Sequence, residues 1–120
     1  MAGIQDLEGK TVVVTGGGSG IGGGMIRRFA KQGMQVVVAD IEGDSAELAA
    51  KALREEGARA IGIACDVSKR SDVAGLADAA IAEFGAVDVA CNNAGIFFGG
   101  KLREFTEGDW EWTMSVNLMG

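Results

Sequence analysis

Four short runs rich in valine, isoleucine and alanine recur along the chain, and a stretch with helical spacing follows each of them. The runs span residues 11–15, 35–40, 59–65 and 87–91. A continuous apolar run is typical of a strand that is buried on both faces, as in a parallel sheet. Because right-handed crossovers join strands that alternate with helices, the pattern predicts an α/β fold with helices on both faces of a parallel sheet.

Side chains that can cap helices predict where three of the helices start. Asp44, with Glu47 three residues later, has the spacing of a capping box, and Ser68 can cap the next helix. Thr106 and Asp109 are expected to open the last helix. Apolar stripes at helical spacing predict the core-facing residues of the second and third helices: Leu48, Ala49, Ala52, Leu53, Val73, Leu76, Ala77, Ala80, Ile81 and Phe84.

A cluster of glycines joins the first predicted strand to the helix that follows it, at residues 16–24. A glycine-rich turn lets the backbone approach a pyrophosphate closely. The helix after it directs its free N–H groups and the positive end of its dipole at the same anion. The cluster therefore predicts a phosphate-binding turn, with a tight turn that binds no ligand as the alternative.

Asp40 ends the second predicted strand, 18 residues after Gly22. At about this spacing a carboxylate reaches the 2′-hydroxyl of an adenosine ribose. The same carboxylate would repel a 2′-phosphate, and neither Ser19 nor Ile41 offers a basic side chain to bind one. Asp40 therefore favours NAD over NADP as the cofactor.

Four motifs, in order along nearly the whole chain, resemble those of the short-chain dehydrogenase/reductase family. The motifs are Thr15-Gly16-x-x-x-Gly20-x-Gly22, Asp66-Val67, Asn92-Asn93-Ala94-Gly95, and Val116-Asn117-Leu118 with Gly120. The resemblance implies that residues 1–120 are the N-terminal part of a Rossmann-like, doubly wound parallel sheet with strand order 3-2-1-4. It also implies hydride transfer between a nicotinamide cofactor and an alcohol or ketone.

The resemblance further implies a role for each matching residue. The implied cofactor-binding residues are Gly16, Ser19, Gly20, Ile21, Gly22, Asp40, Asp66, Val67, Asn93, Ala94 and Gly95. Asp40 would hold the adenosine ribose, and Asp66 would accept from the adenine amino group while the Val67 backbone contacts the ring. Asn117 would be the catalytic asparagine, whose backbone carbonyl holds a water of the proton relay.

Structural roles compete with these functional ones. Asp66 could simply start a helix, and the Asn93 loop could be turn chemistry, since Asn and Gly both favour positive φ. Asn117 shares a helix stripe with Trp110 and Met114, so we expect it to face inward. A buried Asn must be hydrogen-bonded, so it could instead belong to a structural network.

The family's active site also needs a serine and a Tyr-x-x-x-Lys pair, and the chain contains no tyrosine. The resemblance covers about half of the family's usual length, so we expect a portion of a longer enzyme that is inactive by itself. The fourth predicted strand would then be an exposed apolar edge, which is an aggregation hazard and lowers stability. The full-length protein is expected to form homo-oligomers, as the family commonly does.

Composition excludes several other classes of protein. With no histidine and two cysteines, the chain cannot form a Cys/His zinc site or a His-activated nucleophile, and we predict no metal site. A net charge of −6 with scattered basic residues argues against nucleic-acid binding. Residues 1–10 lack the pattern of a signal peptide, and no apolar run is long enough to span a membrane. Cys65 and Cys91 then predict reduced thiols in the cytoplasm.

Two other kinds of function fit the same sequence. A non-catalytic NAD-binding module would bind NAD without turnover. An interaction fragment that docks through its fourth strand and last helix would form a stoichiometric complex and would not need Asp40. An ATP-binding P-loop is excluded because no Gly-Lys-Ser/Thr follows the glycines.

Overall fold

A four-stranded parallel sheet organises the computed structural model, which describes residues 6–120. Its strands are β1 (Thr11–Thr15), β2 (Gln35–Asp40), β3 (Ala60–Ala64) and β4 (Val89–Cys91). They lie in the order β3-β2-β1-β4, and all three pairings are parallel. The predicted α/β fold and its strand order 3-2-1-4 are therefore confirmed. Of residues 1–10, for which no signal peptide is expected, residues 1–5 lie outside the described residues.

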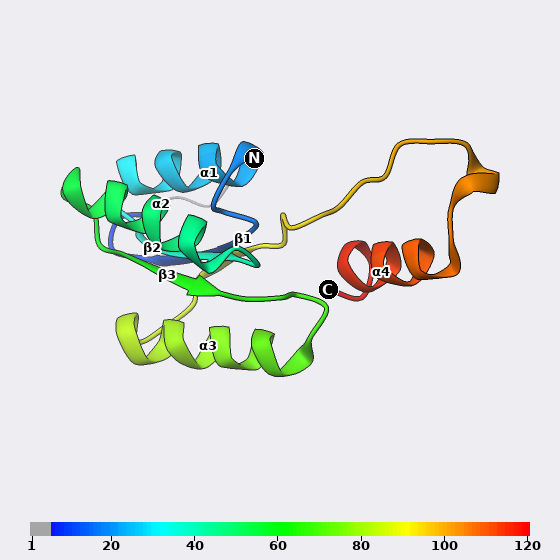
Figure 1. The fold of residues 1–120 in the computed structure, drawn as a ribbon. Helices are drawn as coiled ribbons and strands as arrows, with labels where there is room; N and C mark the ends of the chain where they lie inside the picture. Colours follow the sequence, from blue (N-terminus) through cyan, green and yellow to red (C-terminus); the bar gives the residue numbers. More distant parts are fainter. Residues whose placement is uncertain (1–5) are drawn as a thin grey trace, which may run out of the picture.

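Helices cover both faces of this sheet (Figure 1). α1 (Gly20–Lys31) and α2 (Gly43–Glu55) pack on one face, and α3 (Arg70–Phe84) packs on the other. After β4 the chain runs through a long loop and a short 3-10 helix, η1 (Leu102–Glu104), to α4 (Glu107–Asn117). We call residues 6–91 the body and residues 92–120 the arm, because the arm extends away from the sheet (Figure 1).

Alternating strand residues divide the core into two layers. Val12, Val14, Val36 and Val38 point toward α1 and α2, where they pack with Ile26 and other buried apolar side chains. Val13, Val37 and Ala39 point the other way and pack with Leu76 and Ala80 of α3. Because side chains alternate between the faces of a strand, a continuous apolar run supplies both layers. The expectation of strands buried on both faces is met in β1 and β2.

Two predicted helix starts are wrong by one or two residues. α2 begins at Gly43 with Glu42 as N-cap, because the Asp40 carboxylate already accepts the Glu42 N–H. α3 begins at Arg70, and Ser68 is not its cap, because the Ser68 hydroxyl is bonded to the Asp66 carboxylate instead. The predicted start of α4 is confirmed: the Asp109 N–H donates to Thr106 Oγ1 at 3.1 Å, and the Thr106 N–H donates to Asp109 Oδ2 at 2.9 Å.

The predicted core-facing stripes are only partly correct. α2 buries Leu53 but leaves Leu48 and Ala52 exposed, and its other buried residues are Ala46 and Ala50. This helix lies so close to β3 that a Cβ at Gly62 would be 2.6 Å from the Ala46 backbone. Small side chains therefore occupy the contact face. α3 buries Leu76 and Ala80, with Phe84 partly buried, whereas the rest of its predicted stripe, Val73, Ala77 and Ile81, is exposed.

The strands at the two edges of the sheet are shorter than predicted. β4 begins at Val89 rather than at residue 87, because the Asp88 carboxylate accepts the Thr11 N–H at 2.8 Å. β3 loses one residue at each end relative to the predicted 59–65. β4 forms an edge of the sheet with Ala90 exposed, as expected for the fourth strand.

Candidate functional site

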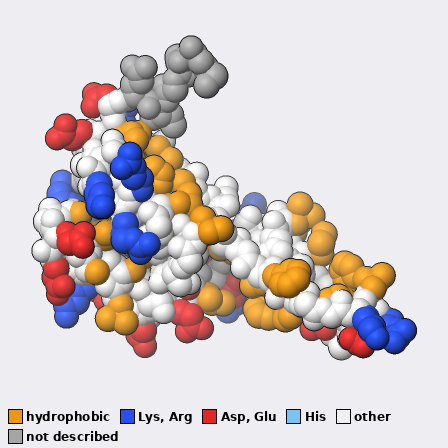
Figure 2. Space-filling view, turned by 90° about the horizontal axis from the view of Figure 1, so that it is seen from above, with side chains coloured by type: hydrophobic (Ala, Val, Ile, Leu, Met, Phe, Trp, Pro, Cys, Tyr) orange, Lys and Arg blue, Asp and Glu red, His pale blue; other side chains and the backbone are white. Residues whose placement is uncertain are grey.

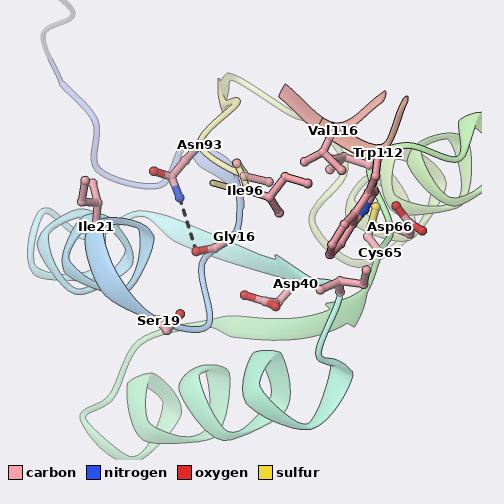
Figure 3. A pocket seen from close by; sticks show the side chains of 14 residues that line it. Gly16, Ser19, Ile21, Asp40, Cys65, Asp66, Asn93, Ile96, Trp112 and Val116 are labelled. Atoms are coloured by element: carbon pink, nitrogen blue, oxygen red, sulfur yellow. Dashed lines mark hydrogen bonds between the residues drawn. The ribbon is translucent and has the colours of Figure 1, made fainter. Parts of the chain in front are cut away.

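A cavity of about 360 Å³ opens at the carboxyl ends of the strands (Figure 3). Its walls come from the segments that follow all four strands, from the start of α1 and from α4. The lining residues are Gly16, Ser19, Ile21, Asp40, Ile41, Cys65, Asp66, Val67, Asn93, Ala94, Gly95, Ile96, Trp112 and Val116. In parallel α/β sheets this end of the strands is where ligands bind. The cavity is therefore the candidate site.

Most of the residues singled out in the sequence meet in this cavity, and three do not. Gly20 and Gly22 do not line it but shape the turn beneath it, and Asn117 lies in the arm outside it. Five lining residues were not singled out as site residues: Ile41, Cys65, Ile96, Trp112 and Val116. Ile41, Cys65 and Ile96 adjoin predicted site residues, so proximity in sequence was an available signal for them. Val116 adjoins the predicted site residue Asn117 in the same way, whereas Trp112 reaches the cavity only because of the path of the arm.

The turn between β1 and α1 requires glycine at particular positions. Gly16 and Gly20 have φ of +65° and +57°, in the left-handed region that side chains disfavour. A methyl group on Gly22 would overlap the Gly16 carbonyl oxygen and lie 2.6 Å from Asn93 Nδ2. These contacts bring the backbone of the turn against the loop after β4. The turn is therefore shaped by close backbone packing as well as by φ.

The first turn of α1 presents unpaired amides to the cavity. Ser19 is the N-cap with an extended backbone, and its side chain makes no capping bond. Intrahelical bonding begins with Gly23, whose N–H donates to the Ser19 carbonyl at 3.0 Å. The first turn, which the structure describes in full, holds no acidic side chain. Free N–H groups and the positive end of the dipole suit an anion such as a phosphate.

Asp40 connects the glycine turn to the start of α2. Its Oδ2 accepts the Gly18 N–H at 3.0 Å, and its Oδ1 accepts the Glu42 N–H at 3.0 Å. A carboxylate has about four lone-pair positions, so both oxygens keep capacity for hydroxyl donors. A Cβ at Gly18 would lie only 2.8 Å from Asp40 Oδ2. Gly18 is thus a further constrained glycine, one that the motif spacing did not identify.

Thr15 and Asn93 join the end of β1 to the loop after β4. Thr15 Oγ1 accepts the N–H groups of Asn93 and Ala94, both at 3.1 Å. Asn93 Nδ2 donates to the carbonyls of Thr15 and Gly16, at 3.0 and 3.3 Å (Figure 3). The Asn93 amide is therefore engaged within the protein, and its contribution to the cavity is its position as a wall. Thr15 was quoted in the motif without a role, and this network supplies one.

The segment after β3 places two ionisable side chains at one end of the cavity. Asp66 Oδ1 accepts the Ser68 hydroxyl at 2.6 Å and the Ser68 N–H at 3.0 Å. The hydroxyl bond is the main reason that the pKa of Asp66 lies below its usual range. Burial, together with the charges of Asp72 and Asp66, raises the pKa of the Cys65 thiol. At neutral pH this end of the cavity thus presents a carboxylate beside a protonated thiol.

Asn117 is exposed, so the prediction that it faces inward is wrong. α4 lies beyond the edge of the sheet, and its stripe therefore does not pack on the core (Figure 1). Both ends of the Asn117 amide are nevertheless hydrogen-bonded: Oδ1 accepts the Ile96 N–H and Nδ2 donates to the Ile96 carbonyl, both at 2.8 Å. This pair of bonds ties α4 to the loop after β4. Asn117 also borders a second cavity of about 190 Å³ within the arm.

Neither metal chemistry nor a membrane span is indicated by the described residues. Within residues 6–120, no group of three or more His, Cys, Asp or Glu side chains is placed to hold a metal ion. In the same part of the chain, no helix combines the length and the apolar character needed to cross a membrane.

Comparison with known proteins matches the family model described as short chain dehydrogenase to residues 10–120. The chain is 43% identical over 119 residues to 3beta-hydroxysteroid dehydrogenase 1 of Eggerthella lenta, covering 97% of this chain and 45% of that protein. It is 42% identical over 118 residues to Tropinone reductase-like 1 of Erythroxylum coca, covering 95% of this chain and 42% of that protein. The chain thus spans less than half the length of these curated relatives.

Solved structures show the same fold. A short chain dehydrogenase/reductase from Burkholderia phymatum in complex with NAD superimposes with a TM-score of 0.93 at 40% identity, over 97% of this chain and 41% of that one. A blue fluorescent protein from a metagenomic library, in complex with NADPH, gives a TM-score of 0.87 at 38% identity, over 96% of this chain and 48% of that one. Similar chains therefore bind nicotinamide dinucleotides of both kinds.

Proposed function

Because the chain belongs to the short-chain dehydrogenase family, we propose that it carries the cofactor-binding half of an NAD-dependent oxidoreductase. The reaction is hydride transfer between the nicotinamide and the carbon of an alcohol or ketone. One observation carries this proposal: a single cavity gathers the glycine turn, Asp40 and Asp66 at the carboxyl ends of parallel strands. When bound, the nicotinamide supplies the hydride chemistry, and the residues of this chain bind and orient it.

The pyrophosphate of the cofactor is assigned to the turn between β1 and α1. Gly16, Gly20 and Gly22 give the backbone its close approach, and the amides of the first turn of α1 face the anion. Ser19 contributes a hydroxyl that no cap uses, and Ile21, which is 80% exposed, is free to cover the cofactor. The same residues support a phosphate site without any basic side chain.

The adenosine is assigned to the side of the cavity between β2 and β3. Asp40 binds the ribose hydroxyls, and Asp66 accepts from the adenine amino group beside the Val67 backbone. Among the described residues that line the cavity, none is Lys or Arg. In this cavity a 2′-phosphate would thus meet the Asp40 carboxylate without a basic side chain in the wall, which supports NAD over NADP as the cofactor.

The nicotinamide half is assigned to the loop after β4. Ala94 and Gly95 line the cavity there, held in place by the bonds between Thr15 and Asn93. Asn117 is proposed to act through its backbone carbonyl, which holds a water of the proton relay. The tyrosine and lysine of that relay are proposed to lie in the half of the relatives that this chain does not span. The domain proposed for residues 1–120 is thus one cofactor-binding unit.

Substrate, location and assembly extend the same proposal. The substrate is a small alcohol or ketone, in keeping with relatives that are named dehydrogenases and reductases. The free cysteines, Cys65 and Cys91, suit a reducing compartment, and we propose a cytoplasmic location. The full-length enzyme is proposed to be a homo-oligomer.

Calorimetric titration of this chain with NADH and with NADPH tests the proposed function. We expect NADH to bind more tightly than NADPH, and Asp40→Ala to weaken NADH binding about tenfold or more, as loss of a charged hydrogen-bonding partner does. Asp40→Asn keeps the shape of the side chain and removes its charge. It should therefore reduce the difference between the affinities for NADH and NADPH, even if the alanine variant folds poorly. Asp78→Ala, which removes a charge from an exposed position of α3, is the matched control.

Each result of the titration bears on a different part of the proposal. Equal affinity for NADH and NADPH would overturn the choice of NAD and leave a dinucleotide site. Failure of the folded chain to bind either dinucleotide would overturn cofactor binding itself. Binding that is insensitive to both Asp40 variants would favour the interaction-fragment alternative, for which this carboxylate has no use.

A further inference from the structure

Among the described residues that line the proposed cofactor cavity, Trp112 is the one aromatic residue. It belongs to α4, yet its indole lies beside Asp66 and Cys65, across the cavity from Ser19 and Gly16 (Figure 3). Its side chain is 46% exposed. The Phe98 ring supports it, with a centroid distance of 5.4 Å and an angle of 56° between the planes. A large aromatic surface is therefore held at the end of the cavity that is assigned to the base.

Trp110 shows that this placement is specific to one side of α4. Residues two positions apart in an α-helix are separated by about 200° around the helix axis, so Trp110 and Trp112 point in nearly opposite directions. Trp110 is exposed to a similar extent, 50%, but it borders the smaller cavity of the arm and packs edge-on against Phe105, at 6.2 Å. The two tryptophans differ in what they face, while their exposure is nearly the same.

The neighbours of Trp112 select a particular kind of ligand group. Ile41, Val67 and Val116 line the same cavity with apolar side chains, which suits a flat ring. Asp66 uses Oδ1 for both bonds from Ser68, and its Oδ2, which lies 3.9 Å from the Lys69 ammonium, still has a lone pair that can accept from an amino group. A flat aromatic ring that carries an exocyclic amino group meets both requirements. Adenine is such a ring, and indole rings stack well on bases.

We propose that Trp112 is the stacking wall for the adenine base of the dinucleotide, and that it increases affinity for the adenosine half of the cofactor. This inference rests on the proposed function, because it assigns a residue to the base within the same site. It also has a structural consequence. The base would connect the arm to the body, since Trp112 belongs to α4 and Ile41, Asp66 and Val67 belong to segments that follow β2 and β3.

The test uses the full chain, single-tryptophan variants and the two halves of the cofactor as probes. In Trp110→Phe the remaining fluorophore is Trp112, and in Trp112→Phe it is Trp110. We expect AMP to quench the fluorescence of Trp110→Phe and to leave that of Trp112→Phe nearly unchanged. By calorimetry, Trp112→Ala should weaken AMP and NADH about tenfold, the usual effect of removing a stacking partner. Trp112→Phe should retain most of the affinity, and Trp110→Ala should match the wild type.

Nicotinamide mononucleotide separates stacking from a structural effect on the arm. Its site lies at the loop after β4, so Trp112→Ala should leave its binding unchanged if Trp112 acts on the base alone. Equal weakening of AMP and the mononucleotide would overturn the proposal in favour of a structural role. AMP binding that quenches neither tryptophan would also overturn it. If NADH binds and depends on Asp40 while Trp112→Ala has no effect, the proposed function holds and this inference alone fails. If the wild-type chain binds neither AMP nor NADH, the proposed function and this inference are both wrong.

Discussion

The body and the arm both contribute walls to the same cavity but are stabilised very differently. In the body, Val12, Val14 and Val36 are fully buried in a sheet with helices on both faces. Val116 is the one buried apolar side chain among residues 92–120, all of which the structure describes, whereas Leu118 is 66% exposed. Figure 2 shows apolar side chains gathered on the surface of the arm. The walls formed by the glycine turn and Asp40 are thus built on a packed core, and the wall formed by α4 is held by few contacts.

The walls that the body and the arm contribute to one site therefore need not share one source of stability. The glycine turn and Asp40 take their positions from β1, β2 and the helices that bury them. Trp112 and Asn117 take their positions from α4. The Asn117 side chain ties this helix to the backbone of Ile96, in the loop after β4. Regions with few buried apolar contacts open at low free-energy cost. We therefore expect the arm to unfold locally before the body does.

Two leucines offer the largest contrast between the regions. Leu53 of α2 is 2% exposed, and Leu118 of the arm is 66% exposed. Leu53→Ala should lower the free energy of unfolding by about 2–5 kcal/mol, because it leaves a cavity in the core. Leu118→Ala should change it by about 0.5 kcal/mol or less. Urea unfolding followed by circular dichroism measures both, and equal effects would contradict the division into body and arm.

Two glycines of α1 differ in how closely they are packed, which extends the comparison to positions within the body. Gly22 is packed against the Gly16 carbonyl, whereas a Cβ at Gly24 would meet only Arg27 Nη2, at 3.9 Å. Gly22→Ala should destabilise the chain by about 1–3 kcal/mol through overpacking and abolish NADH binding. Gly24→Ala should stabilise it by up to about 1 kcal/mol, since alanine favours a helix. Thermal unfolding monitors both, and a destabilising Gly24→Ala would show a constraint on α1 that the packing does not reveal. Nothing in the structure explains why glycine stands at position 24.

Asn117 tests how α4 is attached. Asn117→Ala removes both hydrogen bonds to the Ile96 backbone, which should cost about 1 kcal/mol, because the site is exposed and water replaces the lost partners. Amide hydrogen exchange at Ile96 should then accelerate several-fold, while exchange in β1 and β2 stays slow. Asn92→Ala, an exposed asparagine of the same loop, is the control. Unchanged exchange at Ile96 would mean that other contacts hold the arm in place.

The two thiols give the smallest expected difference. Burial raises the pKa of both Cys65 and Cys91, so the thiolate fraction of each is reduced at pH 8 and rises only at higher pH. Cys65 is 3% exposed, and Cys91, at the end of the edge strand, is half-buried. Iodoacetamide should therefore label Cys91 first and Cys65 slowly, as followed by mass spectrometry. Faster labelling of Cys65 would mean that the cavity opens more readily than the edge of the sheet.

The residues that were predicted correctly share one property: their signal is local. The strand–glycine–helix junction, Asp40 at a strand end and the Thr106 capping box each depend on neighbours within a few positions. Not every local signal held, since the caps predicted at Asp44 and Ser68 are wrong. The wrong predictions of burial concern packing partners. Leu48 and Val73 lie on apolar stripes, but the close approach of α2 to β3 and the open side of α3 leave them exposed. Asn117 was placed inward for the same reason, because a helical stripe does not tell which neighbour covers it.

The α/β class, the family and the position of the glycine turn follow from the sequence alone. Strand and helix periodicities, and the backbone freedom of glycine, act over short distances and can be recognised in a linear pattern. Packing between elements explains why Gly18 must clear the Asp40 carboxylate and why Trp112, rather than Trp110, faces the candidate site. These outcomes depend on how the chain brings residues 40 and 112 to the glycine turn. Contacts of that kind arise from packing between elements, which spacing along the chain does not encode.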